Sequence, residues 1–247
     1  QRAQAAPPAQ AAVAKYQFLF FHKDQSPETQ SLYTVFQGAM RKAASRAEPR
    51  VVNLNDPSET ALVRRLGVDR APMPMVMAIA PNGAIMGGFP GKFDETQILG
   101  AFGTPAQEKS LKAFQENKMV FLCVQNERTK LNEESVRGVY EFKNDPQFSR
   151  HTEVVFVNPD DPTESRFLQQ LAIDPKTDTA ISAFMTPPGV VLGLFPGPTD
   201  KNVLVQHLTL GGCGPDCHCL KSQQAQADSG GVLKKFFGKI SSTFGKK

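Results

Sequence analysis

The chain of 247 residues contains no tryptophan, only four cysteines and no long hydrophobic run. A helix needs about 18 or more consecutive apolar residues to cross a membrane, and the sequence has no such segment. Three of the cysteines fall between residues 213 and 219, which excludes a disulfide framework spread over the chain. The sequence also has no phosphate-binding loop, no EF-hand and no zinc-protease motif, so it predicts none of these sites.

The net charge is small outside the C-terminal end. The formal net charge is +4, but residues 221–247 hold six Lys and one Asp, a net charge of +5. Removing these from the totals of 28 basic and 24 acidic residues leaves 22 and 23, a net charge of −1 for the body. Domains that bind nucleic acid show a basic face, so the sequence predicts no nucleic-acid partner. The basic tail instead indicates contact with an anionic surface.

The first residues, 1–14, are mostly Ala, Gln and Pro with a single Arg, a composition typical of a flexible spacer. They contain neither an initiator Met nor the apolar core of a signal peptide. We expect an exported protein whose signal has been removed, periplasmic or extracellular, with a trimmed chain as the alternative.

Between residues 15 and 104 the apolar pattern predicts four strands and three helices in the order βαβαββα. Each strand is a short apolar run, and each helix follows a polar residue suited to the N-cap, namely Ser26, Asp56 or Asp94. Pro81-Asn82-Gly83 predicts a tight turn before the last strand. The strands are expected at 16–22, 50–54, 74–80 and 84–89, and the helices at 27–42, 57–66 and 95–102.

The same order recurs between residues 116 and 210, which indicates an internal repeat. The segment Val52–Pro57 matches Val157–Pro162, and Gly88–Gly91 matches Gly193–Gly197. Residues 105–115 between the two units are predicted to be a linker or the start of a helix. In the second unit the strands are expected at 118–124, 152–157, 179–184 and 190–195, and the helices at 132–142, 164–171 and 199–208.

This order of elements resembles the thioredoxin fold. In the first unit, Pro74 with its apolar strand, the turn at 81–83 and a strand ending near Phe89 are similar to the stretch after the family's cis-proline. The resemblance covers residues 15–104 and 116–210. It implies an α/β protein with two tandem thioredoxin-like domains, followed by a C-terminal amphipathic helix.

The resemblance does not extend to the family's redox motif. Thiol–disulfide exchange needs a thiolate at a helix N-terminus and a second thiol within reach, usually as Cys-x-x-Cys. The corresponding positions, 24–28 and 126–129, read Asp-Gln-Ser-Pro-Glu and Asn-Glu-Arg-Thr. Cys123 lies inside a strand, where we expect it to fill the core. Thr179 and Ala180 stand where a cis-proline is expected in the second unit. The sequence therefore predicts a non-catalytic binding or scaffolding protein.

Two residues are candidates for contact with a partner protein. The resemblance places Met73 and Pro74 at the family's substrate groove. Such a groove holds extended peptides by strand addition. His22, His151 and His207 are isolated in the sequence, and we expect them to be structural.

The segment 211–220 is rich in cysteine and permits three interpretations. Cys213, Cys217 or Cys219 could form a local disulfide or an intermolecular crosslink, as suits an exported protein. The three thiols and His218 could instead bind zinc or copper, although their spacing is tight for one tetrahedral site. Unreacted thiols are the third interpretation. No cofactor is certain, and a metal-binding or thiol-exchange protein is the alternative function.

Residues 221–231 predict a linker, and residues 232–247 predict a basic amphipathic helix. This pattern fits an interfacial membrane helix, a helix that docks in a partner's groove, or a helix that packs on its own protein. We expect the body to be tethered to a membrane surface or a larger protein assembly, and leave a homo-oligomer open. The apolar face would comprise Val232, Leu233, Phe236, Phe237, Ile240 and Phe244, and the basic face would include Lys234, Lys235 and Lys239.

Overall fold

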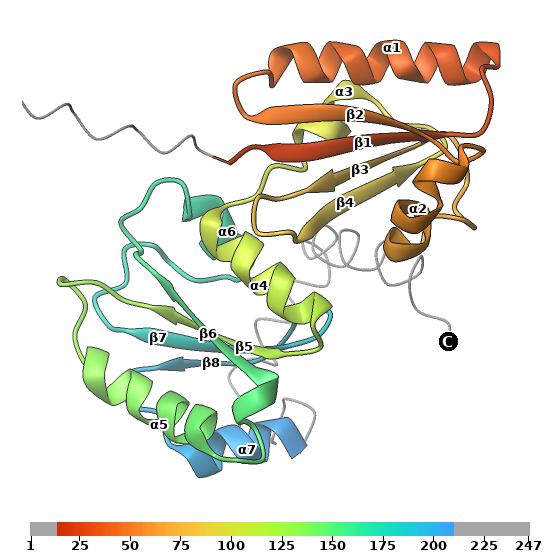
Figure 1. The fold of residues 1–247 in the computed structure, drawn as a ribbon. Helices are drawn as coiled ribbons and strands as arrows, with labels where there is room; N and C mark the ends of the chain where they lie inside the picture. Colours follow the sequence, from red (N-terminus) through yellow and green to blue (C-terminus); the bar gives the residue numbers. More distant parts are fainter. Residues whose placement is uncertain (1–13, 210–247) are drawn as a thin grey trace, which may run out of the picture.

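The computed structural model describes residues 14–209, which form two four-stranded sheets with a helix between them (Figure 1). In the first sheet, β1 (Tyr16–His22) pairs in parallel with β2 (Ala47–Asn53) and antiparallel with β3 (Met75–Ile79). The strand β4 (Ile85–Pro90) completes the order β2-β1-β3-β4 through an antiparallel hairpin.

The second sheet repeats this arrangement with the order β6-β5-β7-β8. Its strands β5 and β6 are parallel, and β7 and β8 are antiparallel neighbours. The two sheets with their helices confirm the predicted fold class, two tandem thioredoxin-like domains. The strands are β5 (Met119–Val124), β6 (Thr152–Val157), β7 (Ile181–Thr186) and β8 (Val190–Pro196).

Two helices of the first domain begin where the sequence places polar N-caps. In α1 (Pro27–Lys42) the Ser26 side chain accepts the Thr29 N–H, and in α3 (Glu95–Leu99) Asp94 and Gln97 form a capping box. A 3₁₀ turn (Pro57–Glu59) precedes α2 (Thr60–Leu66), which ends at Gly67 with a φ of 64°, a value that favours glycine. The helices of the second domain are α5 (Asn132–Asn144), α6 (Ser165–Gln170) and α7 (Lys201–Thr209), with a 3₁₀ turn at Ser149–His151.

Residues 105–115 form the helix that joins the two domains, α4 (Pro105–Gln115). Leu111 packs into the core of the first domain, whereas Ala113 and Phe114 pack into the core of the second. The Gln115 side chain also accepts the Ile85 N–H at 2.9 Å and donates to the Ile85 carbonyl at 2.8 Å. The helix therefore belongs to both cores, and Figure 1 shows it lying between the two sheets.

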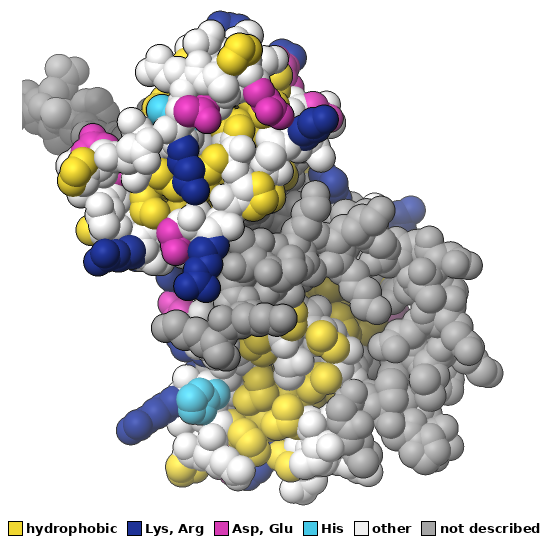
Figure 2. Space-filling model, turned by 90° about the vertical axis from the view of Figure 1, so that its right-hand side faces the viewer, with side chains coloured by type: hydrophobic (Ala, Val, Ile, Leu, Met, Phe, Trp, Pro, Cys, Tyr) yellow, Lys and Arg dark blue, Asp and Glu magenta, His cyan; other side chains and the backbone are white. Residues whose placement is uncertain are grey.

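Each sheet is covered on both faces. In the first domain, Phe18, Phe20 and Phe36 are buried with α1 and α3 on one face, while Phe21 and Met77 are buried with α2 on the other. Burial of each such side chain stabilises the fold by about 1.5–3 kcal/mol. On the surface, Lys and Arg are interspersed with Asp and Glu over the first domain in the view of Figure 2, so this face carries no patch of a single charge.

Several element boundaries differ from those expected by one to three residues, and those of β2, α3 and β7 illustrate why. The strand expected at 50–54 is β2, which starts at Ala47, because Glu48 and Arg50 of this edge strand are exposed and hide its pattern. The helix expected to reach Phe102 ends at Leu99, since Phe102 turns to pack against Tyr16 with ring centroids 4.8 Å apart. The strand expected at 179–184 is β7 and runs from Ile181 to Thr186.

Candidate functional site

A polar loop in the first domain stands where a thioredoxin redox pair would be. Residues 25–28 at the start of α1 contain no thiol. Asp24 Oδ1 accepts hydrogen bonds from the Ser26 N–H at 3.1 Å and the Thr29 hydroxyl at 2.8 Å. These bonds, that from Ser26 first, hold the pKa of Asp24 below its ordinary value. The side chains of this loop therefore order the start of the helix.

The segment before β3 presents backbone groups that have no partner. The Met73–Pro74 peptide bond is cis, and the Pro74 carbonyl accepts the Gly91 N–H at 2.8 Å. The Met73 N–H and carbonyl make no hydrogen bond to any residue that the structure describes. Met73 is half-buried. Because backbone donors and acceptors are strong hydrogen-bonding groups, an extended chain could pair with them.

The matching segment of the second domain is already paired. Gly197 donates its N–H to the Ala180 carbonyl at 2.8 Å, which makes Ala180 the counterpart of Pro74 and Thr179 the counterpart of Met73. The Thr179 N–H donates to the Thr177 hydroxyl at 3.2 Å, and that hydroxyl donates to the Thr179 carbonyl at 2.7 Å. One side chain thus occupies both backbone groups that stay open at Met73.

A second set of backbone bonds closes the other side of this segment. Lys130 donates its N–H to the Asp178 carbonyl at 2.8 Å, and Ala180 donates its N–H to the Lys130 carbonyl at 2.9 Å. Lys130 and Thr179 thereby form a parallel bridge. Proline has no N–H, so Pro74 cannot make the bond that Ala180 makes. The strand β7 begins two residues later than expected, at Ile181, which pairs with Val124 at the end of β5.

Arg128 ties the closing loop to the rest of the second domain. Its guanidinium bonds to Asp160 at 2.7 Å, to the Thr177 carbonyl at 2.6 Å and to the Pro175 carbonyl at 3.3 Å. The hydrogen bond from Arg128 lowers the pKa of the Asp160 carboxyl. An exposed ion pair alone contributes about 0–1 kcal/mol, so the carbonyl contacts are what hold residues 175–177 in place.

The comparisons add no function to this geometry. No protein-family model matches the chain, and no curated protein matches it. Among solved structures it is similar to the germline-specific thioredoxin Deadhead from Drosophila melanogaster, with 20% identity, 36% of this chain and 79% of that chain covered, and a TM-score of 0.30.

Two tandem structures are similar over a longer stretch. One is the first two thioredoxin domains of Saccharomyces cerevisiae Eps1p, with 10% identity, 79% of this chain and 91% of that chain covered, and a TM-score of 0.29. The other is the NTD_N/C domain of alkylhydroperoxide reductase AhpF from Enterococcus faecalis, with 13% identity, 78% and 89% covered, and a TM-score of 0.29. The fold assignment rests on the strand order and register described above.

The structure describes only some of the residues singled out in the sequence. Cys213, Cys217, His218 and Cys219 lie outside the described residues, so the disulfide, metal and thiol interpretations stay predictions. The tail residues Val232, Leu233, Phe236, Phe237, Ile240 and Phe244, with Lys234, Lys235 and Lys239, also lie outside them. Between residues 14 and 209 no helix is long and apolar enough to cross a membrane, and no three His, Cys, Asp or Glu side chains gather as metal ligands.

Cys123 is buried in β5, with 1% of its surface exposed. Its Sγ atom lies 3.9 Å from the Ser182 hydroxyl, and burial raises the pKa of the thiol to about 11. Because the thiolate is the reactive form, this cysteine is held in the inert, protonated state at neutral pH.

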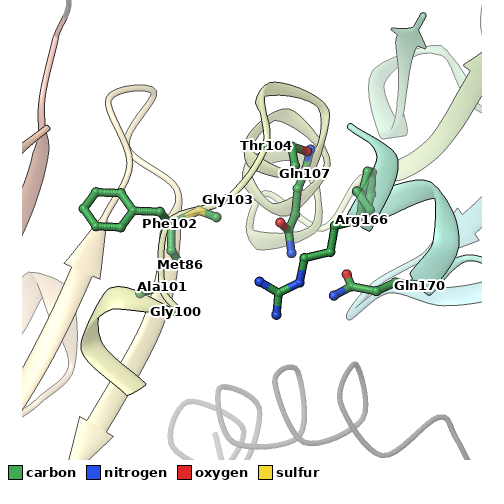
Figure 3. Close-up of a pocket in the computed structure, with 10 residues that line it drawn as sticks. Met86, Gly100, Ala101, Phe102, Gly103, Thr104, Gln107, Arg166 and Gln170 are labelled. Carbon is green, nitrogen blue, oxygen red and sulfur yellow. The ribbon is translucent and has the colours of Figure 1, made fainter. Parts of the chain in front are cut away.

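A small cavity lies at the junction of the two domains, with a volume of about 70 Å³. Figure 3 shows Gln107 from α4 and Arg166 and Gln170 from α6 reaching into the same space, across from Met86 and Gly103 of the first domain. A space of this size suits a few water molecules rather than a substrate. A larger cavity lies beside α1 in the first domain.

The sequence indicated Met73, Pro74 and Ala180. When the two repeats are aligned, the first has proline and the second has alanine at the same position. The sequence did not indicate Thr177 or Arg128. Their roles depend on loops 47–49 residues apart in the chain, and neither residue belongs to a recognisable motif.

Proposed function

We propose that the protein is a non-catalytic binding protein that holds an extended segment of a partner protein at Met73 and Pro74 of the first domain. The observation that carries the proposal is the contrast between two matching units. The Met73 backbone is open, whereas Thr179 is paired by Thr177. The second domain, closed by its own loop and joined through α4, supports the first as a rigid body.

The expected affinity from this edge alone is modest. A backbone hydrogen bond contributes about 0.5–1.5 kcal/mol net, and two such bonds do not offset the loss of freedom on association. A partner must therefore add side-chain contacts around the edge. The proposed scaffolding role, with attachment to a membrane surface or assembly through residues 232–247, is supported by the sequence of the tail.

The test uses peptides selected on the full chain from a displayed library of unstructured sequences. Selected peptides should shift the backbone NMR signals of residues 72–75 and 91–92, and should leave residues 177–180 unchanged. Peptides that bind only at the second domain, or a library that yields no saturable binder, would contradict the proposal.

Two variants of Met73 distinguish the contribution of its backbone N–H to peptide binding from the contribution of its side chain. Met73→Leu keeps the N–H and the apolar volume, and should bind the selected peptides as the natural chain does. Met73→Pro removes the N–H, and should weaken binding by about two- to tenfold, the value of one hydrogen bond.

A further inference from the structure

A cavity lies in the first domain, between the start of α1 and the edge strand β2. Its volume of about 430 Å³ falls within the range of pockets that hold small molecules or single side chains, roughly 300–1,000 Å³. It is separate from the junction between the domains, and no established role accounts for it. The lining residues are Phe20, His22, Asp24, Gln25, Thr29, Gln30, Tyr33 and Val51.

One wall of this pocket is aromatic and apolar. The Phe20 and Tyr33 rings have centroids 5.2 Å apart, and Phe20 and His22 have centroids 6.1 Å apart. Phe20 is buried beneath the pocket, while Tyr33 and His22 are half-buried and Val51 is 44% exposed. Flat, delocalised cations stack on aromatic faces of this kind.

The other wall is formed by exposed side chains, among them Asp24 and Gln30, whose hydrogen-bond acceptors the described residues use only in part. Asp24 uses Oδ1 for the Ser26 N–H and the Thr29 hydroxyl, and its Oδ2 has no partner among the described residues. Gln30 donates its amide to the Gln25 carbonyl at 3.0 Å, which leaves its own Oε1 unpaired there. No described salt bridge involves Asp24.

We propose that this pocket binds the guanidinium group of an arginine side chain from a partner protein. A guanidinium is planar, always charged and carries five N–H donors, so it fits an unpaired carboxylate oxygen, an amide oxygen and an aromatic face at once. An ammonium group is a compact point charge and matches fewer of these features. The proposal does not depend on strand pairing at Met73.

The probes are small capped amino acids, titrated into the full chain and followed by NMR. N-acetyl-arginine amide should give saturable shifts at residues 24, 25, 30 and 33. N-acetyl-citrulline amide has nearly the same shape without the charge, and should bind about tenfold more weakly, as should N-acetyl-lysine amide. No saturation with the arginine probe, or equal affinity for citrulline, would overturn the proposal.

Matched variants test whether the arginine probe binds in this pocket. Asp24→Asn keeps an oxygen for the Ser26 N–H and the Thr29 hydroxyl but removes the charge, and should weaken arginine binding about tenfold. Asp56→Asn is the control, because Asp56 caps a helical turn through a similar bond to the Ser58 N–H at 2.9 Å and does not line the pocket. Tyr33→Leu should also weaken binding. Equal losses in the Asp24 and Asp56 variants would rule out the pocket.

Discussion

Proline at position 74 and alanine at position 180 occupy matching places before β3 and β7, and they differ in the amide hydrogen. With that hydrogen, Ala180 donates a hydrogen bond to the Lys130 carbonyl, and this bond holds the loop that contains Lys130 against the segment before β7. Pro74 has no such hydrogen and cannot make this bond, and the Met73 N–H and carbonyl have no partner among the described residues. At the scale of residues, two groups thus distinguish the closed edge from the open one. They are the amide hydrogen of Ala180 and the hydroxyl group of Thr177.

Replacing Thr177 by valine should open the closed edge. Valine has nearly the same shape but no hydroxyl, so the Thr179 N–H and carbonyl lose their partner. Hydrogen exchange at the Thr179 amide should accelerate, and the free energy of unfolding should fall by about 1 kcal/mol. Thr163→Val is the control, since the Thr163 hydroxyl bonds only within its own turn, to Asp161. Unchanged protection at Thr179 would show that Thr177 does not close the edge.

Glu108 should make the stability of the protein depend on pH. Its carboxylate accepts the Tyr16 hydroxyl at the junction of the domains, and burial, followed by the charge of Glu164, raises its pKa above the ordinary 4.5. The folded state then binds this proton more tightly than the unfolded state does. Stability from this group is therefore complete below the unfolded pKa and decreases as pH rises from about 4.5 through the folded pKa.

Glu108→Gln should flatten that decrease in denaturant unfolding measured from pH 4 to pH 8. Glu116→Gln is a control of opposite sign, because Lys118 lowers the pKa of Glu116 and its contribution disappears as pH falls. If the slope between pH 4 and pH 8 is the same in the Glu108 variant, another group is responsible for it.

At the scale of elements, strands and caps were predictable where their signals are local. The apolar run of β1 and the caps Ser26 and Asp94 each lie within a few residues of the element they define. The helix α4 was predicted only as one of two alternatives, a linker or the start of a helix, because its apolar residues serve two cores: Leu111 faces the first domain and Phe114 the second. The candidate edge followed the same rule, since Pro74 is visible in the sequence but the long-range contacts of Arg128 are not.

Because α4 packs into both cores, a destabilising substitution in this helix should lower the stability of both domains. Leu111→Ala removes a side chain that is 2% exposed, and should lower the free energy of unfolding by about 2–5 kcal/mol. Native-state hydrogen exchange should show reduced protection in β1 and β5 alike. Lys109→Ala, at an exposed position of the same helix, is the control. Loss of protection confined to the first domain would mean that the two domains unfold independently.

At the scale of the whole molecule, the proposed binding edge at Met73 and the proposed arginine pocket both lie on the first domain, and the described part of the second domain has no open counterpart of the Met73 edge. The shared helix α4 gives the two domains a fixed connection. Such a connection would let the body present a bound partner in a defined orientation, as the proposed scaffolding role requires. The sequence predicts that charge helps to hold the body in place, since the body is nearly neutral and the basic residues are concentrated in the tail.

The tail should bring the body to anionic membranes. Each Lys near an anionic surface contributes about 1 kcal/mol, an attraction that added salt weakens, and residues 232–247 hold five Lys and no acidic residue. The full chain should sediment with vesicles containing phosphatidylserine at low salt and be released at high salt, whereas a chain ending at Ser229 should stay in solution. Replacing Phe236 and Phe237 by Ser keeps the charge and removes apolar area. This variant therefore separates the electrostatic contribution to membrane binding from the contribution of apolar burial. If the truncated chain sediments as well as the full one, the tail is not the anchor, and the groove of a partner or the protein's own surface becomes the expected place for its apolar face.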